Sequence, residues 1–158
     1  MNINKIYTKI ITDEDLMETV QHGSNLYPFQ FYYEDLSVFD FNCIEWHWHT
    51  ELEFIYIESG TVTLWIGEYQ FHLTEGNGIF INTKVLHRLY SPSKALIPNF
   101  VFMPSFIAPC DSLIYQKYIL PIISSSLPFL VFHKKVCWQA KVLSIMRQII
   151  SAQDSVLS

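Results

Sequence analysis

Residues 45–60 read EWHWHTELEFIYIESG, and this stretch is the strongest indicator of the fold. Its Trp, Phe, Ile and Tyr content, ended by Ser-Gly, is typical of short β-strands joined by turns. Side chains two positions apart on a strand face the same side. We therefore expect His47 and His49 to face one side of a sheet, and Trp46 and Trp48 to face the other.

The same texture continues from about residue 27 to residue 107. Short strand-like runs alternate with turns rich in Gly, Asn, Pro and Ser; the runs are FQFYYEDL, CIEWHWH, LEFIYIESG, TVTLWIG, EYQFHL, GIFIN, HRLYS and IPNFVFM. Many short strands at this spacing predict an antiparallel sandwich or barrel. We expect residues 25–109 to form this mostly β unit.

The two ends of the chain have a different texture. Residues 1–24 are expected to form an N-terminal arm, within which TDEDLMETVQHG resembles either a short helix capped by Thr12 or Asp13 or an extended arm. After Pro109 the runs DSLIYQKYILPII and VCWQAKVLSIMRQIISAQDSVL predict a pair of α-helices within residues 110–158. Helices of this kind bury an apolar stripe against a neighbouring element.

Length and composition restrict the function. The chain has 158 residues, enough for one domain with a core, and a formal net charge of −5 with only ten scattered Lys and Arg residues, which argues against nucleic-acid binding by this chain itself. Three cysteines without a C-x-x-C pair suit reduced thiols in a cytoplasmic protein. Neither a signal peptide nor a membrane span is expected from the pattern of apolar residues.

Four residues could form a metal site. A turn after His49 would bring Glu53 onto the neighbouring strand beside His47 and His49, and His87 lies on a later strand that could complete the set. Three imidazoles and a carboxylate suit a divalent transition metal such as Zn, Ni, Fe or Mn. The alternative is a polar cluster that lines a pocket and hydrogen-bonds internally or to a ligand.

The run HWHTELEFIYIESGTVTLWIGEYQFHLTEGNGIFINTKVLHRL is similar to the two motifs of the cupin superfamily. More closely, it resembles the N-terminal effector-binding and dimerisation domain of AraC-type transcriptional regulators. The resemblance implies a cupin-like antiparallel β-barrel, or jelly roll, followed by a C-terminal α-helical pair. It also implies a small-molecule effector inside the barrel and a homodimer. DNA would be bound only through a C-terminal helix-turn-helix domain, which is absent from this chain.

The sequence departs from the superfamily pattern at several positions. Phe41 stands where the first motif expects glycine, and Asn82 and Lys84 stand where the second motif of the enzymes has proline and glycine. These departures favour the regulators, so we expect a sensing domain without catalytic residues. The alternative is a small metal-dependent cupin enzyme, an oxygenase or an isomerase.

The expected ligand-binding residues combine the polar cluster with aromatic side chains; they are His47, His49, Glu53, His87, Arg88, Phe31, Tyr33, Trp65 and Phe80. Small-molecule pockets are mostly apolar with a few polar groups. Simple core packing is the alternative for each aromatic residue, and a surface ion pair is the alternative for Arg88. We expect Ile55 and Ile57 to face inward with Glu53, and His22, His72 and His133 to lie outside the site.

The last predicted helix carries a wide apolar face. The resemblance implies a dimer interface on it, which we assign to Trp138, Val142, Leu143, Met146, Ile149 and Ile150. Packing of the same face against the chain's own barrel is the alternative.

Overall fold

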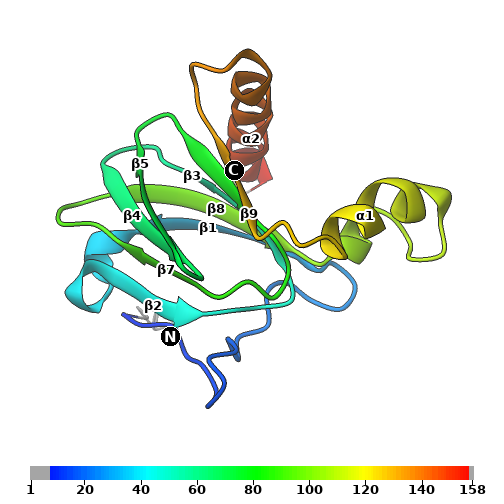
Figure 1. Cartoon of the computed structure of the whole chain (residues 1–158), viewed down its shortest axis with the longest axis horizontal. Coiled ribbons are helices and arrows are strands. Elements are labelled where there is room, and N and C mark those ends of the chain that lie inside the picture. Colours follow the sequence, from blue (N-terminus) through cyan, green and yellow to red (C-terminus); the bar gives the residue numbers. More distant parts are fainter. Residues whose placement is uncertain (1–7, 157–158) are drawn as a thin grey trace.

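Two antiparallel sheets lie face to face in the computed structural model, which describes residues 8–156 (Figure 1). The five-stranded sheet has the order β1 (Phe29–Asp35), β8 (Leu96–Phe102), β3 (Leu52–Tyr56), β6 (Gly78–Ile81) and β9 (Phe129–Phe132). The four-stranded sheet has the order β2 (Cys43–His47), β7 (His87–Tyr90), β4 (Thr61–Ile66) and β5 (Tyr69–Thr74). The fold is mostly β, as predicted, and has the two-sheet form of a cupin jelly roll rather than a single closed barrel.

The inner core fills the space between the two sheets. Alternate residues of each strand point into it, and they are almost all aliphatic because a sheet face buried on another sheet excludes water. Ile55 of β3 and Ile57, which directly follows β3, face inward as predicted and are 1% and 0% exposed. The remaining buried members are Leu36, Ile44, Val62, Leu64, Ile66, Leu73, Ile79, Ile81, Leu89, Ala95 and Ile97.

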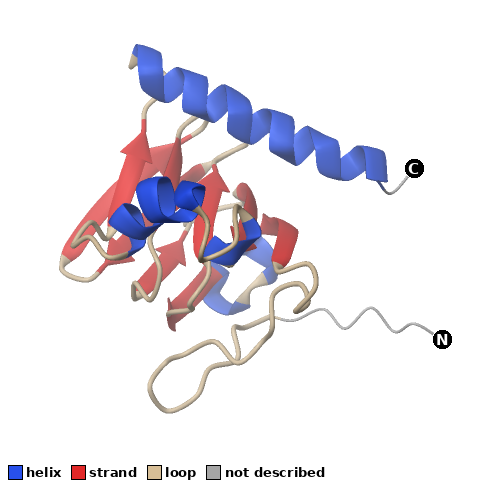
Figure 2. Ribbon diagram, turned by 90° about the vertical axis from the view of Figure 1, so that its right-hand side faces the viewer, coloured by secondary structure: helices blue, strands red, loops and turns tan. Residues whose placement is uncertain are grey.

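A second core lies on the outer face of the five-stranded sheet, under the long helix α2 (Cys137–Val156) (Figure 2). Leu143 and Met146 of the helix pack on aromatic side chains of β3, β6, β8 and β9, among them Phe54, Phe80, Phe100, Phe102 and Phe132. Close approach is possible because Gly78 has no side chain: a Cβ there would lie 2.8 Å from the carbonyl oxygen of Ile55 and 3.0 Å from Leu143. The five-stranded sheet is therefore covered on both faces.

The segment before α2 corrects one expectation. Residues 110–158 were expected to form a pair of helices, and between those helices Phe129–Phe132 form strand β9, which pairs with β6. A run of four apolar residues that follows Pro128 is too short to form a helix, and the edge of β6 offers it a backbone partner. The first predicted helix is a π-helical turn at Tyr115–Ile119 (η4) that continues into α1 (Leu120–Ile123) and projects from the body in Figure 1.

The N-terminal arm, as far as it is described from residue 8 onward, is extended and contains no helix. The helix suggested for TDEDLMETVQHG is wrong because the side chain of Asp13 accepts hydrogen bonds from the backbone N–H groups of Asp15 and Met17, at 2.9 Å each, and closes a tight turn instead. The arm then runs beside Trp48, whose backbone N–H donates to the carbonyl of Leu16. The first seven residues of the predicted arm lie outside the described residues.

Three short 3₁₀ turns complete the described elements: η1 (Leu36–Val38), η2 (Asp40–Asn42) and η3 (Pro104–Phe106). Cys43 is buried, Cys110 and Cys137 are exposed, and all three are free thiols. In the described part of the chain, no helix combines the length and apolarity that crossing a bilayer requires.

The loop after β6 links two parts of the fold. The side-chain amide of Asn82 donates to the carbonyls of Ile122 and Leu127, at 2.9 Å each, and so holds the turn between α1 and β9. The next two residues hold the turn between β2 and β3: the hydroxyl of Thr83 donates to Thr50 O at 2.6 Å and Lys84 N donates to His49 O at 2.8 Å. Lys84 has a left-handed backbone, with φ 59°, at the position where the resemblance expects glycine.

Candidate metal and ligand site

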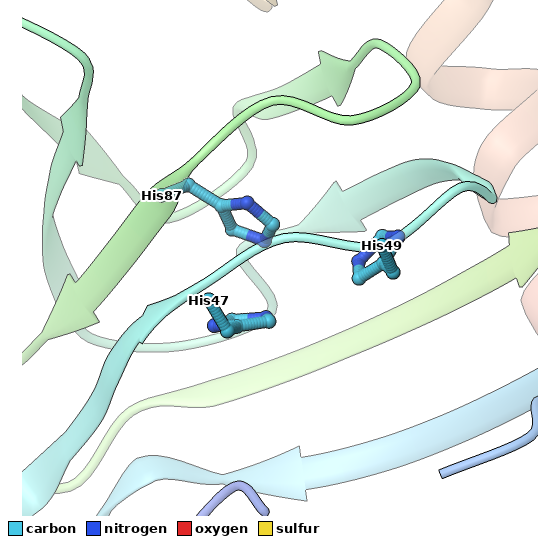
Figure 3. A group of neighbouring side chains, drawn as sticks. All are labelled: His47, His49 and His87. Carbon is cyan, nitrogen blue, oxygen red and sulfur yellow. The ribbon is translucent and has the colours of Figure 1, made fainter. Parts of the chain in front are cut away.

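Three predicted histidines meet between the sheets. His47 ends β2, His49 lies in the turn that follows, and His87 begins β7; Figure 3 shows the three rings gathered in one region. Their ligand nitrogens lie within 4.8 Å of one another, and the residues are 4%, 5% and 0% exposed. The side-chain parity predicted from EWHWH is confirmed, since Trp46 and Trp48 lie on the other side and Trp48 donates from Nε1 to Asp15 O of the arm.

All three imidazoles are oriented in the same way by the backbone. Nδ1 of His47 donates to Glu45 O at 2.8 Å, Nδ1 of His49 donates to Glu51 O at 3.1 Å, and Nδ1 of His87 donates to Val85 O at 2.8 Å. A hydrogen bond from Nδ1 to a carbonyl fixes the tautomer and leaves Nε2 as the coordinating atom. The fold therefore presents three Nε2 atoms to one shared space.

Glu53 adds a carboxylate to this group, as predicted. Its Oε2 lies 3.0 Å from Nε2 of His49 and 3.2 Å from Nε2 of His87, and the residue is 7% exposed. The contact to His49 has hydrogen-bond geometry, whereas Nε2 of His87 has no aligned hydrogen-bond partner among the described residues. A buried polar atom without such a partner carries a desolvation cost, which a ligand could remove.

The ionisation of the group is set by burial and by Glu53. Burial and the neighbouring His87 lower the pKa of His47 to about 3, so this imidazole is neutral at pH 7. Burial also disfavours the charged form of His49, but the hydrogen bond and the charge of Glu53 outweigh it and raise the pKa of His49 to about 9. Burial opposes ionisation of Glu53, yet the hydrogen bond from His49 and the adjacent imidazole of His87 hold its pKa well below the ordinary value.

These residues fit a divalent metal ion. Neutral imidazole Nε2 atoms and one carboxylate are the ligands that Zn, Ni, Fe and Mn accept, and the carbonyl partners of Nδ1 supply the outer support that such sites have. Without a metal, His49 donates a hydrogen bond from Nε2 to Glu53, and the same two atoms would hold the ion. Loading would require the Nε2 proton to leave.

A cavity of about 420 Å³ opens beside the histidines. The described arm, strand β1 and the inner faces of both sheets line it, with His47, His49 and Glu53 at one end. Aliphatic side chains form much of its wall, including Ile10, Val20, Ile44, Leu89 and Ile97. Polar and charged side chains make up the rest of the lining, and a cavity of this size is typical of small-molecule sites.

A hydrogen-bonded chain connects the arm to the cavity wall. Tyr32 of β1 lies with its hydroxyl 2.6 Å from Nδ1 of His22, and Nε2 of His22 lies 2.9 Å from Oε2 of Glu18. The ring of His22 also contacts His49 edge to face, with centroids 5.6 Å apart. His22 is 6% exposed, so the arm brings a buried polar residue directly against the histidine group.

A second carboxylate stands further along the same wall. Glu34 of β1 accepts a hydrogen bond from the side-chain amide of Asn99 at 2.9 Å, and both residues line the cavity. Burial raises the pKa of Glu34 to about 7, although the Asn99 hydrogen bond acts in the opposite direction. Glu34 lacks a basic partner among residues 8–156.

Five of the predicted ligand-binding residues lie at the cavity or beside it. His47, His49, Glu53 and Tyr33 line it, and His87 lies against His47 with ring centroids 4.2 Å apart. Tyr33 is 55% exposed at the rim, where its hydroxyl donates to Glu58.

The other four predicted residues lie elsewhere. Phe31 and Phe80 face the outer side of the five-stranded sheet and pack in the second core, because they have the opposite strand parity to the cavity wall. Arg88 and Trp65 lie on the outer face of the four-stranded sheet, where the guanidinium stacks 4.6 Å from the Trp65 ring and pairs with Glu45 at 3.0 Å. The surface ion pair considered for Arg88 is the arrangement observed.

Sequence reasoning missed several polar residues of the cavity; they are Glu18, His22, Tyr32, Glu34 and Asn99. Glu51, in the turn after His49, also lies close to the site, with a side chain only 15% exposed and an oxygen 3.7 Å from Nδ1 of His49. The parity of FQFYYED was the available signal, since Tyr32 and Glu34 alternate with Phe31 and Tyr33. His72 and His133 are exposed, as expected.

The predicted dimer residues divide into three groups by exposure. Leu143 and Met146 are 0% and 2% exposed because they pack on the chain's own sheet, so they are unavailable to a partner. Val142, Ile149 and Ile150 are partly buried against the same core. Trp138 is 52% exposed.

Comparison with known proteins identifies the β unit. Residues 43–97 match the cupin domain family, so the chain contains a cupin domain. Over 143 residues it is 25% identical to the uncharacterized HTH-type transcriptional regulator YdeC of Bacillus subtilis (strain 168), covering 88% of this chain and 48% of that protein. The chain thus spans about half the length of the curated relative it matches.

Solved structures of modest similarity include three bacterial proteins. A conserved protein of unknown function from Streptococcus pyogenes has a TM-score of 0.44 and 19% identity, covering 49% of this chain and 66% of that one. A cupin-2 domain containing protein from Shewanella frigidimarina has a TM-score of 0.41 and 20% identity, covering 51% of this chain and 81% of that one. A variant of B. subtilis oxalate decarboxylase has a TM-score of 0.36 and 20% identity over 39% of this chain and 18% of that one.

Proposed function

We propose that this chain is the small-molecule-sensing domain of a transcriptional regulator of the AraC type. The cavity of about 420 Å³ between the sheets carries this proposal, because its lining combines aliphatic side chains with several polar groups and includes residues of the N-terminal arm. The relative YdeC, an HTH-type regulator, aligns with most of this chain over about half of its own length.

The regulatory step requires two states with different affinity for the effector. A molecule in the cavity contacts the arm through residues such as Val20 and His22 and contacts the inner sheet faces through Ile55 and Leu89. It therefore favours the arrangement in which the arm is closed on the sheets. A DNA-binding domain would sense this change in the arm through the face of the five-stranded sheet that α2 covers.

DNA binding by the complete gene product tests this function. A gel-shift assay on its own promoter region should show a complex whose stability changes when small molecules are added. Variant Leu89→Trp, which fills the cavity from β7, should abolish the response while leaving DNA binding itself intact. DNA binding that is indifferent to every compound and to the Leu89 substitution would contradict the sensing role.

Dimerisation belongs to the same proposal. Trp138 and Ile145 of α2 are 52% and 55% exposed and offer an apolar surface to a second copy of the chain. Sedimentation analysis should show a dimer that Ile145→Glu dissociates and that the exposed control Gln148→Glu on the same helix leaves intact. A monomer at every concentration tested would remove this part of the proposal.

A metal-dependent enzyme is the second candidate, and the convergence of three oriented imidazoles with Glu53 is the observation that favours it. A bound metal would supply a Lewis acid or a site for dioxygen. In this role His47, His49, His87 and Glu53 would hold the ion, and the cavity would orient the substrate. Turnover of a substrate by metal-loaded protein, lost in His47→Ala, would favour the enzyme over the sensor.

A further inference from the structure

The cavity has a polar group that is separate from the histidine site. Glu34 of β1 lies opposite Ile97 of β8, whereas Glu53 of β3 lies opposite Val101 of the same strand. Four residues along β8 correspond to an offset of about 13 Å between the two glutamates. A ligand group held by Glu34 would therefore lie well away from the histidines.

The carboxylates that line the cavity differ in their partners. Glu18 is bound by His22, Glu53 is bound by His49, and Asp35 accepts from Ser37 and lies 3.8 Å from Lys94. Glu34 is bound only by the neutral amide of Asn99 among the described residues.

The basic groups near the cavity do not form an ion pair with Glu34. Lys9, which also lines the cavity, lies 4.0 Å from Asp40, and its side chain is 78% exposed. The imidazole of His22 is already held between Glu18 and Tyr32. Among the described residues, Glu34 is therefore the lining carboxylate that forms no ion pair or hydrogen bond with a basic group, and His22 acts on its charge only from a distance.

A carboxylate in this position recognises a cation. Transferring a carboxylate from water into a partly buried wall is unfavourable unless a positive group pairs with it. The raised pKa of Glu34 has this cause, since burial is its largest contribution. A protonated amine would supply both the charge and two or three N–H donors.

We propose that the cavity binds a small molecule with an apolar body and a protonated amine, and that Glu34 receives the amine. The inference rests on the proposed sensing function and names the chemical class of its effector. The apolar body lies against the aliphatic wall formed by Ile10, Val20, Ile44 and Leu89. An anionic molecule of the same shape would place its charge beside Glu34 and Glu18 and would be repelled.

Matched probes separate charge from shape. We would measure by calorimetry the binding of tryptamine, tryptophol and indole-3-acetate, and of 2-phenylethylamine, 2-phenylethanol and phenylacetate. The members of each set share an aromatic body and differ in whether they carry an ammonium, a hydroxyl or a carboxylate. A chelator is present throughout, so that a metal cannot recruit the acids.

We expect the affinity of each amine to be at least about tenfold higher than that of its alcohol. The affinity of each acid should be lower than that of the alcohol. Glu34→Gln, which keeps an oxygen for Asn99, should lower amine affinity to the level of the alcohol without changing alcohol affinity. Glu68→Gln, the same charge change at an exposed turn residue, should preserve the preference.

Amines that bind no tighter than the alcohols, or a preference that survives Glu34→Gln, would overturn the inference. The wild-type comparison needs no variant, so a misfolded Glu34→Gln protein does not remove the test. If the amine preference holds while DNA binding ignores every compound, the regulatory function fails and this inference stands. If DNA binding responds to neutral or anionic molecules but never to amines, only this inference fails.

Discussion

The imidazole Nε2 of His49 lies 3.0 Å from Oε2 of Glu53, and both side chains are buried between the sheets. This hydrogen bond holds one proton between the nitrogen and the carboxylate, and a metal ion bound by both atoms would replace that proton. The raised pKa of His49, about 9, shows that the proton is held strongly in the absence of metal. The behaviour of the site therefore depends on what replaces that proton.

Metal binding is the first prediction. The protein should bind one equivalent of Zn²⁺ or Mn²⁺, and His47→Ala should weaken binding at least a hundredfold, since one of its few ligands is lost. His72→Ala, at an exposed histidine outside the site, is the matched control. Affinity should rise about tenfold per pH unit from pH 7 to about pH 9, because His49 must release its proton. Calorimetry in buffers of different ionisation enthalpy measures that proton; affinity independent of pH would contradict this assignment.

The pH dependence of stability is the second prediction. The lowered pKa values of His47 (about 3) and Glu53 mean that the folded state loses stability as pH falls below 6.5 and 4.5 respectively. The raised pKa values of Glu34 (about 7) and His49 (about 9) mean that stability is lost as pH rises above 4.5 and 6.5 respectively. Between pH 4.5 and 6.5, His47 and Glu34 oppose each other. Metal-free protein should therefore be most stable across that interval and less stable on either side.

Glu34→Gln isolates one of these groups. Without Glu34, the effect of His47 is unopposed, so the free energy of unfolding should rise with pH between 4.5 and 6.5, by at most about 1.4 kcal/mol per pH unit. Urea unfolding at a series of pH values, in a chelator, measures both curves. Parallel curves for wild type and variant would show that Glu34 does not titrate as inferred.

The packing of α2 gives the third prediction. Leu143→Ala should lower the free energy of unfolding by about 2–5 kcal/mol, because the side chain is fully buried against the chain's own sheet. Ile145→Ala, two positions along the same helix and 55% exposed, should change it by no more than about 0.5 kcal/mol in the monomer. Equal effects of the two substitutions would mean that the helix does not lie on the sheet as described.

The arm gives the fourth prediction. His22→Ala removes the hydrogen bonds to Tyr32 and Glu18 and leaves both partners unpaired, so the arm should separate from the sheets more often. Hydrogen exchange at the backbone N–H groups of Glu18 and Trp48 should accelerate, because each is bonded across the arm. His133→Ala, at an exposed histidine, serves as the control. Unchanged exchange in His22→Ala would show that these contacts do not secure the arm.

The strands and the histidine group were predictable from local patterns. Eight segments with strand composition correspond to β1–β8, and the H-x-H spacing with Glu53 specified which side chains face inward. Strand β9 was not predictable in the same way. Phe129–Phe132 is short, and its partner β6 lies about fifty positions earlier in the chain, so local patterns do not reveal the pairing.

The cavity wall was harder to predict for a different reason. The five-stranded sheet is covered by the second sheet on one face and by α2 on the other, so apolar residues occupy both faces of β6, with Ile79 and Ile81 on one face and Phe80 on the other. Hydrophobicity then does not distinguish the cavity side from the helix side. Phe31 and Phe80 were assigned to the wrong face, while Tyr32 and Glu34, on the correct face, were overlooked.

Residues 82–84 make the histidine turn and the helical segment one mechanical unit. Asn82 forms hydrogen bonds with the turn that leads into β9. Thr83 and Lys84 form hydrogen bonds with the turn that carries His49. A loop of three residues has little freedom to absorb a displacement at one end without passing it to the other. A displacement of the turn that carries His49 would therefore act, through this loop, on the segment between α1 and β9.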